Sequence, residues 1–195
     1  TQEQLDFLRF PLGEIDKSET RSIAKKLNLN VADKPDSQDI CFVPNGDYSS
    51  VIQKFRPESF KKGKIIDLSG KQIGEHEGII NYTIGQRRGL GLSFPEPRYV
   101  KKILPNENKI IVSKKDNLLS NGCYLSKINW MEDVDFPLNC KVRIRYNSKG
   151  ADAKIIKKNN TLFCEFDTPQ LAVTPGQSMV FYNKNAIIGG GIIEE

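Results

Sequence analysis

The chain has 195 residues, 38% of them hydrophobic and 27% charged, which is typical of a soluble globular protein with one large domain or two to three small ones. No apolar stretch is long enough to span a bilayer, and the polar first residues do not resemble a secretion signal. The net charge of +5 permits a nucleic-acid partner but does not require one.

The cysteines and the histidine bear on compartment and metal binding. Cys41, Cys123, Cys140 and Cys164 form no C-x-x-C pair, and His76 is the only histidine, so a zinc site is not expected. The last three cysteines lie in β-rich sequence and are expected in a core. Without a secretion signal, we expect a cytoplasmic protein with reduced thiols. The chain does not begin with Met, and we expect a fragment or processed form that is monomeric.

Two helices are expected near the start of the chain. Thr1 and Gln4 fit a capping box for a helix over residues 1–7, and Asp16 is a suitable N-cap for a second helix. No sheet that these helices could cover is evident around them. We therefore interpret residues 1–60 as the helical C-terminal remnant of an α/β domain.

Cys41 lies between a polar cluster and an apolar run that Pro44 closes. A free cysteine is usually a small buried hydrophobe. Asp36 and Asp39 would raise its pKa unless a cation or a helix N-terminus offset them. A cysteine at such a junction can also lie at the rim of a cleft, so the residues leave both a core role and a reactive role open.

A β-rich region follows a third helix. Apolar residues at helical spacing predict an amphipathic helix over residues 47–55, which ends before Pro57. The next segments read as a strand over residues 63–67 and a hairpin within residues 98–113. We interpret residues 61–116 as a small central β domain.

The central region also contains a basic, glycine-rich loop over residues 85–91. It lacks the strand-then-helix context of a dinucleotide fingerprint. Its backbone amides, with Arg87 and Arg88, could bind phosphate, although an ordinary exposed loop explains the pattern as well. His76 has no partner at a spacing that suggests acid–base chemistry, so we expect a structural role.

Residues 117–195 read as short strands separated by turns, which favours a closed antiparallel β-barrel or a sandwich. The predicted fold class is therefore mainly β with N-terminal helices, and the C-terminal part is expected to be a barrel.

One strand of this region alternates apolar and basic residues. Cys140, Val142, Ile144 and Tyr146 are expected to face a core, and Lys141, Arg143 and Arg145 to form a basic row on the outer face. The row is either a solvated strand face or a contact to RNA phosphates. Tyr146, at the end of the strand, could stack on a base.

Four stretches are similar, in the same order, to motifs of the tRNA-specific 2-thiouridylase family. They are P-D-S-Q-D-I-C-F (35–42), G-E-H-E-G (74–78), Y-T-I-G-Q-R-R-G-L-G (82–91), and A-V-T-P-G-Q-S (172–178) followed by G-G-G-I-I-E (189–194). This resemblance covers essentially the whole chain. It implies the end of an adenylating α/β domain, a small central domain and a C-terminal barrel.

The resemblance implies a tRNA-uridine 2-sulfurtransferase that acts on the wobble uridine. In this family ATP, with Mg²⁺, adenylates the C2 oxygen of the uridine, and Cys41 would carry a persulfide delivered by a sulfur-donor protein. The terminal sulfur attacks C2, or a second cysteine releases it as sulfide. AMP leaves, and the two cysteines end as a disulfide. Arg145, Tyr146 and Gln177 match positions that contact tRNA.

The chain departs from the family pattern at two points, because it has neither the S-G-G-x-D-S phosphate-binding loop nor the family's first cysteine. We therefore expect ATP to be bound by an N-terminal domain outside these residues, and the fragment alone to bind tRNA weakly and to be inactive. The alternative is a non-catalytic RNA-binding β-barrel module, and a third class is a structural module with no RNA role.

Overall fold

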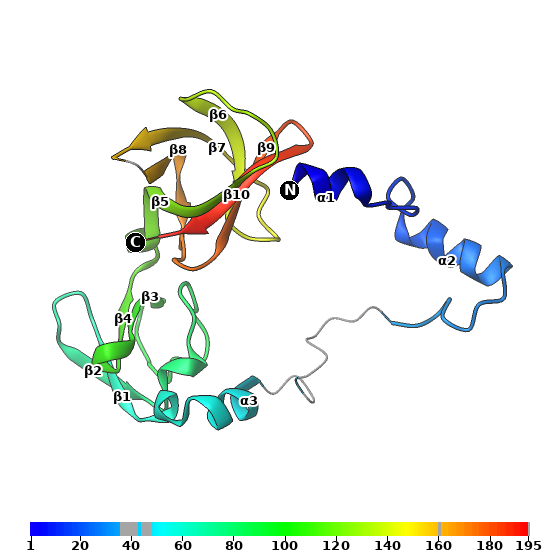
Figure 1. The fold of residues 1–195 in the computed structure, drawn as a ribbon. Coiled ribbons are helices and arrows are strands. Elements are labelled where there is room, and N and C mark those ends of the chain that lie inside the picture. Colours follow the sequence, from blue (N-terminus) through cyan, green and yellow to red (C-terminus); the bar gives the residue numbers. More distant parts are fainter. Residues whose placement is uncertain (36–42, 44–47, 160, 195) are drawn as a thin grey trace. The chain divides into compact units, whose positions relative to one another are not determined.

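The computed structural model describes residues 1–35, 43, 48–159 and 161–194 (Figure 1). The chain forms two compact units, which we call the N-terminal unit (1–51) and the C-terminal unit (52–195). The predicted Cys41 segment lies outside the described residues. No described helix combines the length and the apolar character needed to cross a membrane.

The two helices of the N-terminal unit begin where the capping residues predict. Helix α1 spans Gln2–Phe7 and has a complete capping box between Thr1 and Gln4. Helix α2 spans Lys17–Lys26, and the Asp16 carboxylate accepts a hydrogen bond from the backbone N–H of Glu19 at 2.8 Å. Both helix starts are therefore confirmed.

Neither helix buries a side chain within the described residues. The exposed large apolar side chains here are Leu5, Phe7, Leu8, Phe10, Leu12, Ile23, Leu27, Leu29 and Val31. Phe7 at the end of α1 is 85% exposed, and Leu27 directly after α2 is 65% exposed. Large apolar side chains of helices normally pack against other elements. The assignment of these helices to a larger α/β domain remains a prediction.

The expected third helix spans the boundary between the two units, and a small mixed sheet follows it in the C-terminal unit. Helix α3 spans Tyr48–Phe55, and the short 3₁₀ helix η2 spans Pro57–Phe60. The four strands that follow are β1 (Gly63–Ile66), β2 (Gln72–His76), β3 (Tyr99–Leu104) and β4 (Lys109–Ser113). Their order is β2-β1-β4-β3. Both hairpins are antiparallel, whereas β1 and β4 run parallel.

The core of this sheet also holds the glycine-rich loop in place. Ile65, Val100, Ile110 and Val112 are buried in the sheet, and Leu90 of the loop joins them with 5% of its surface exposed. Because Leu90 is anchored, the basic residues before it lie at a defined place beside β3 rather than on a free loop.

The remaining strands form a closed six-stranded barrel in the order β10-β5-β8-β7-β6-β9 (Figure 1). They are β5 (Leu119–Trp130), β6 (Leu138–Arg143), β7 (Ala151–Lys158), β8 (Thr161–Leu171), β9 (Ser178–Asn183) and β10 (Ala186–Ile193). All pairs are antiparallel. Because the six strands close into a ring, the C-terminal region is a barrel and not a sandwich. The predicted fold class, mainly β with N-terminal helices, is confirmed.

The alternation along β6 holds only as far as Ile144. Val142 and Ile144 are buried, and Cys140 is partly buried. Tyr146, however, is 96% exposed, so its expected place in the core is wrong. The physical reason is a turn, because the carbonyl of Arg145 accepts hydrogen bonds from the N–H and hydroxyl of Ser148 at 3.1 and 2.9 Å. This turn ends the two-residue period of the strand.

Candidate nucleic-acid interface

Arg145 is held at the edge of the barrel by one strong contact. Its Nη2 donates to the carbonyl oxygen of Ala172 at 2.6 Å, and the Thr174 hydroxyl donates to the same oxygen at 2.9 Å. Ala172 is buried and has a left-handed backbone with φ 52°. Its N–H donates to the carbonyl of Leu118, in the η5 segment (Lys115–Leu118) that connects the sheet to the barrel. The guanidinium is therefore oriented before any ligand binds.

The glycine-rich loop reaches the barrel at this same point. A Cβ on Gly85 would lie 3.1 Å from the Ala172 Cβ and 3.6 Å from Nη2 of Arg145. The φ of Gly85 is +87°, a conformation that L side chains rarely adopt. The close approach and the backbone conformation both favour glycine, which accounts for this residue in the loop.

The Gln86 side chain holds this loop in shape. Its Oε1 accepts from the backbone N–H of Thr83 at 2.9 Å, and its Nε2 donates to the carbonyl of Arg88 at 2.9 Å. The loop is also joined to β3, because Gly85 N–H donates to Val100 and Val100 N–H donates to Gln86. A loop tied at several points loses little entropy when it binds a ligand.

These elements enclose a pocket of about 730 Å³, which we call the loop–barrel pocket. Its lining comes from residues 82–86, Ile103 and Arg145, and from the β8–β9 connection with Thr174, Pro175 and Gln177. Thus the structure brings together Arg145 and Gln177, which lie far apart in the sequence. Gln177 is exposed, and its N–H donates to the Thr174 carbonyl at 3.3 Å.

Of the basic row Lys141, Arg143 and Arg145, one side chain is already paired with a carboxylate. Lys141 forms an ion pair with Asp152 at 2.9 Å. Arg143 lies over the ring of Tyr182, with its Cζ 5.1 Å from the ring centroid. Within the described residues, neither Arg143 nor Arg145 pairs with a carboxylate. Two of the three cations are therefore available to an anionic ligand.

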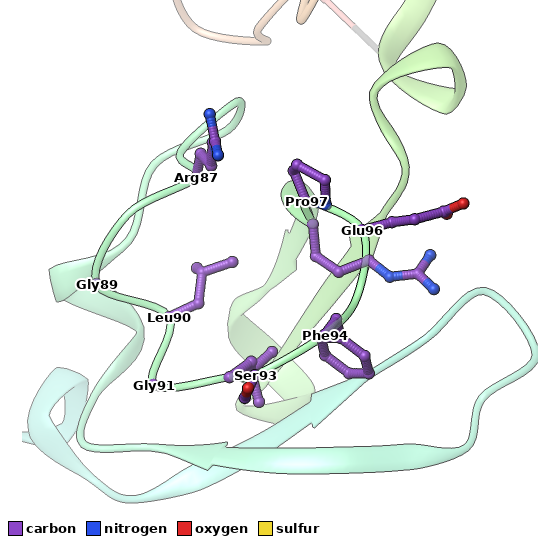
Figure 2. Close-up of a pocket in the computed structure, with 10 residues that line it drawn as sticks. Arg87, Gly89, Leu90, Gly91, Ser93, Phe94, Glu96 and Pro97 are labelled. Carbon is purple, nitrogen blue, oxygen red and sulfur yellow. The ribbon is translucent and has the colours of Figure 1, made fainter.

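The other candidate residues lie in different surroundings. Tyr146 follows Arg145 in an exposed turn, where its ring is accessible for stacking. Arg87 and Arg88 are exposed on the glycine-rich loop, and Arg87 lines a second pocket (Figure 2). Cys41 falls outside the described residues, so its role stays a prediction.

Sequence reasoning missed Ala172, whose carbonyl orients Arg145. Its side chain carries no chemical signal, and its position matters only through a backbone atom. Ala172 has a left-handed backbone, a conformation that is uncommon for residues other than glycine. The residue type therefore gave no sign of it. The A-V-T-P-G-Q-S stretch that contains Ala172 was found only by resemblance.

His76 has the structural role that the sequence predicts. It is 2% exposed, its Nδ1 accepts from the N–H of Gly78 at 3.1 Å, and its Nε2 lies 3.3 Å from the carbonyl of Asn108. The contacts assign the proton to Nε2. Burial lowers the pKa of His76 despite the opposing effects of the Asn108 carbonyl and Glu77.

The chain matches three domain families in succession. Residues 1–45 match the tRNA methyl transferase HUP domain, residues 49–114 the tRNA methyl transferase PRC-barrel domain, and residues 120–193 the aminomethyltransferase beta-barrel domain. The three matches together extend over almost the whole chain.

Full-length relatives agree with these matches. The chain is 48% identical over 197 residues to the tRNA-specific 2-thiouridylase MnmA of Rickettsia canadensis, which covers 99% of this chain and 54% of the relative. It is 47% identical to the same enzyme of Rickettsia typhi and 48% identical to that of Rickettsia massiliae, again over 99% of this chain and over 55% and 54% of the relatives. The chain thus spans about half the length of these curated relatives, and it belongs to the tRNA-specific 2-thiouridylase family.

Proposed function

We propose that this chain is the part of a tRNA 2-thiouridylase that holds the tRNA and carries the sulfur-donating cysteine. The full enzyme would replace the C2 oxygen of the wobble uridine by sulfur, in a reaction that ATP activates. Its tRNA substrate would be bound by the C-terminal unit and its sulfur supplied by a separate persulfide-carrying protein. The family membership supports the reaction class, and the loop–barrel pocket supports the division of roles.

The observation that carries this proposal is the meeting of Arg145, Gln177 and the glycine-rich loop at one pocket. Arg145 reaches it from the turn after β6, Gln177 from the β8–β9 connection, and the loop from the central sheet. A preoriented guanidinium beside the exposed amide side chain of Gln177 suits the phosphates and sugars of RNA. Tyr146 and Arg143 would extend the contact over the adjoining barrel surface.

The proposal assigns to Cys41 the persulfide whose outer sulfur reaches the uridine C2. The reaction conserves atoms: the new C2–S bond forms as the bond from C2 to the adenylated oxygen breaks, and the adenylate leaves as AMP. If the outer sulfur is transferred directly, its bond to the Cys41 sulfur must also break. A second thiol supplies that electron pair by forming a disulfide with Cys41.

ATP binding is assigned to no residue of this chain. The sequence contains no S-G-G-x-D-S loop. In our proposal ATP and Mg²⁺ are held by a part of the full-length enzyme beyond these 195 residues. The steps assigned to this chain are tRNA positioning and sulfur presentation.

The proposal is tested in the full-length enzyme with two separate readouts, tRNA filter binding and 2-thiouridine content. Cys41→Ser should abolish thiolation and change tRNA affinity less than twofold, while Cys140→Ser should retain activity. Arg145→Gln should weaken tRNA binding about tenfold, because a charge-assisted hydrogen bond is lost. Arg56→Gln removes the same charge from an exposed pair with Glu58 and serves as the control.

The outcomes separate the alternatives. Unchanged thiolation in Cys41→Ser would rule out the sulfur-carrying role and favour a non-catalytic RNA-binding module. Equal binding by Arg145→Gln and Arg56→Gln would remove Arg145 from the interface. Binding that does not fall with salt would contradict phosphate contacts altogether and favour a structural module.

A further inference from the structure

A second pocket lies beside the central sheet, between the two arms of the loop over residues 87–98 (Figure 2). Its volume is about 420 Å³. Figure 2 shows Arg87 on one arm and Glu96 and Pro97 on the other, joined through the segment from Gly89 to Phe94. Arg98 also lines it. We call it the arginine pocket.

The charges around the arginine pocket leave it positive. The Cζ of Arg98 lies 5.2 Å from the centroid of the Phe94 ring, a stacking contact that orients its guanidinium. Glu96 is the one acidic lining residue, and it pairs with Lys114 at 2.6 Å. The hydrogen bond from Lys114 lowers the pKa of Glu96. Arg98 also acts electrostatically on Glu96, but Lys114 holds that carboxylate in an ion pair, so the three cations outnumber the one anion and the pocket remains positive.

The backbone of the loop supplies further donors. Among the described residues, the N–H groups of residues 87–94 form no hydrogen bond with the protein. Gly89 has φ +73°, a conformation that lets consecutive N–H groups converge on an anion. The loop keeps this shape because Leu90 is buried and the Gln86 side chain holds the carbonyl of Arg88. The shape of the loop is therefore fixed before a ligand arrives.

We propose that the arginine pocket binds a phosphate of the RNA backbone, with Arg87 and Arg98 as its charged ligands. This inference rests on the proposed tRNA binding and adds a contact on the central sheet, apart from the loop–barrel pocket. Guanidinium groups and free backbone amides are both donors that suit the oxygens of a phosphodiester. The contact would position the tRNA without reading its sequence.

The test measures tRNA affinity of the full-length enzyme across a salt series. Arg87→Gln and Arg98→Gln should each lower affinity about tenfold at low salt. Each should also reduce the slope of log affinity against log salt by about 1, because one fewer counterion is released. Arg98→Lys keeps the charge but loses the planar fork, so its affinity should fall between wild type and Arg98→Gln. Arg56→Gln is the matched control.

Two results would overturn the inference. If Arg87→Gln and Arg98→Gln behave like Arg56→Gln while Arg145→Gln still weakens binding, the arginine pocket is not an RNA contact and the proposed function stands. Calorimetric titration with inorganic phosphate and AMP tests the other source of phosphate. Saturable binding that both substitutions abolish, with unchanged tRNA affinity, would assign the pocket to a small free anion. Arg87 is exposed, so Arg87→Gln keeps the test valid if Arg98→Gln fails to fold.

Discussion

At the scale of single residues, the cysteines of the barrel differ from a reactive thiol. Cys123 and Cys164 are buried opposite each other on β5 and β8, and burial raises the pKa of Cys140 to about 11. At pH 8 only about one Cys140 in a thousand is then a thiolate, the form that reacts. The hydrogen bond with Cys164 lowers the pKa of Cys123, but burial keeps both of these thiols away from reagents, so none of the three barrel cysteines suits sulfur transfer.

We therefore predict that iodoacetamide at pH 8 modifies the folded chain at Cys41 before any other cysteine. Peptide mapping by mass spectrometry should find one fast equivalent at Cys41, and Cys41→Ser should lose it. Denaturation should then expose Cys123, Cys140 and Cys164 to the same reagent. Fast labelling of Cys140, or a Cys41 as slow as the barrel cysteines, would contradict the role proposed for Cys41.

The sequence predicts the role of a single residue correctly where neighbouring residues in the chain determine that role. The caps at Thr1 and Asp16 depend on atoms within three residues, and both were read correctly from the sequence. Tyr146 was not, because the turn at Ser148 interrupts an alternation that the residue types would have continued. The anchoring of Arg145 by the Ala172 carbonyl depends on residues 27 positions apart and left no local signal.

At the scale of elements, the glycine-rich loop and the barrel meet through the contact between Gly85 and Ala172. We predict that Gly85→Ala destabilises this contact and weakens tRNA binding. The left-handed backbone alone should cost about 1–2 kcal/mol, and the new Cβ would also press on Ala172 at 3.1 Å. Displacement of the loop would disturb both Arg145 and the loop–barrel pocket.

Gly70→Ala is a matched control for this prediction. Gly70 has φ +85°, close to the +87° of Gly85, but a Cβ there meets nothing within 4 Å. Both variants should lose stability in urea unfolding through backbone strain, whereas only Gly85→Ala should lose tRNA affinity. Equal tRNA affinity in the two variants would show that the contact with Ala172 does not shape the binding surface.

Elements were predictable in kind, but their long-range pairing was not. The hairpin of β3 and β4 follows from two β-rich runs around a turn, and it was located to within one residue. The parallel pairing of β1 with β4 joins segments more than 40 residues apart. The turn spacing of the C-terminal region suited a sandwich as well as a barrel, since closure depends on the pairing of β6 with β9.

At the scale of the whole molecule, the C-terminal unit depends on a buried neutral histidine in its central sheet. His76 lies between the Asn108 carbonyl and the N–H of Gly78, and a Cβ on Gly63 would lie 2.5 Å from its Nε2. A second proton would turn Nδ1 into a donor facing the donor N–H of Gly78. Burial, which disfavours the charged imidazolium, lowers the pKa of His76 below its ordinary 6.5, although the Asn108 carbonyl and Glu77 oppose this shift.

We predict that stability falls as the pH drops below about 6.5, because the unfolded chain then binds a proton that the folded chain resists. The folded pKa is lowered, so the stabilisation is complete above the unfolded pKa and is lost as the pH falls through the folded one. Urea unfolding at intervals from pH 7.5 to pH 5 should show this decline in wild type.

The control variant is His76→Asn, which keeps an acceptor for the Gly78 N–H but cannot titrate. It should be less stable than wild type at neutral pH, and its stability should change less with pH. Carboxyl groups with lowered pKa, such as Asp16 and Asp67, affect stability only in a more acidic range. A decline of equal size in wild type and His76→Asn between pH 7 and pH 5 would therefore show that His76 is not its cause.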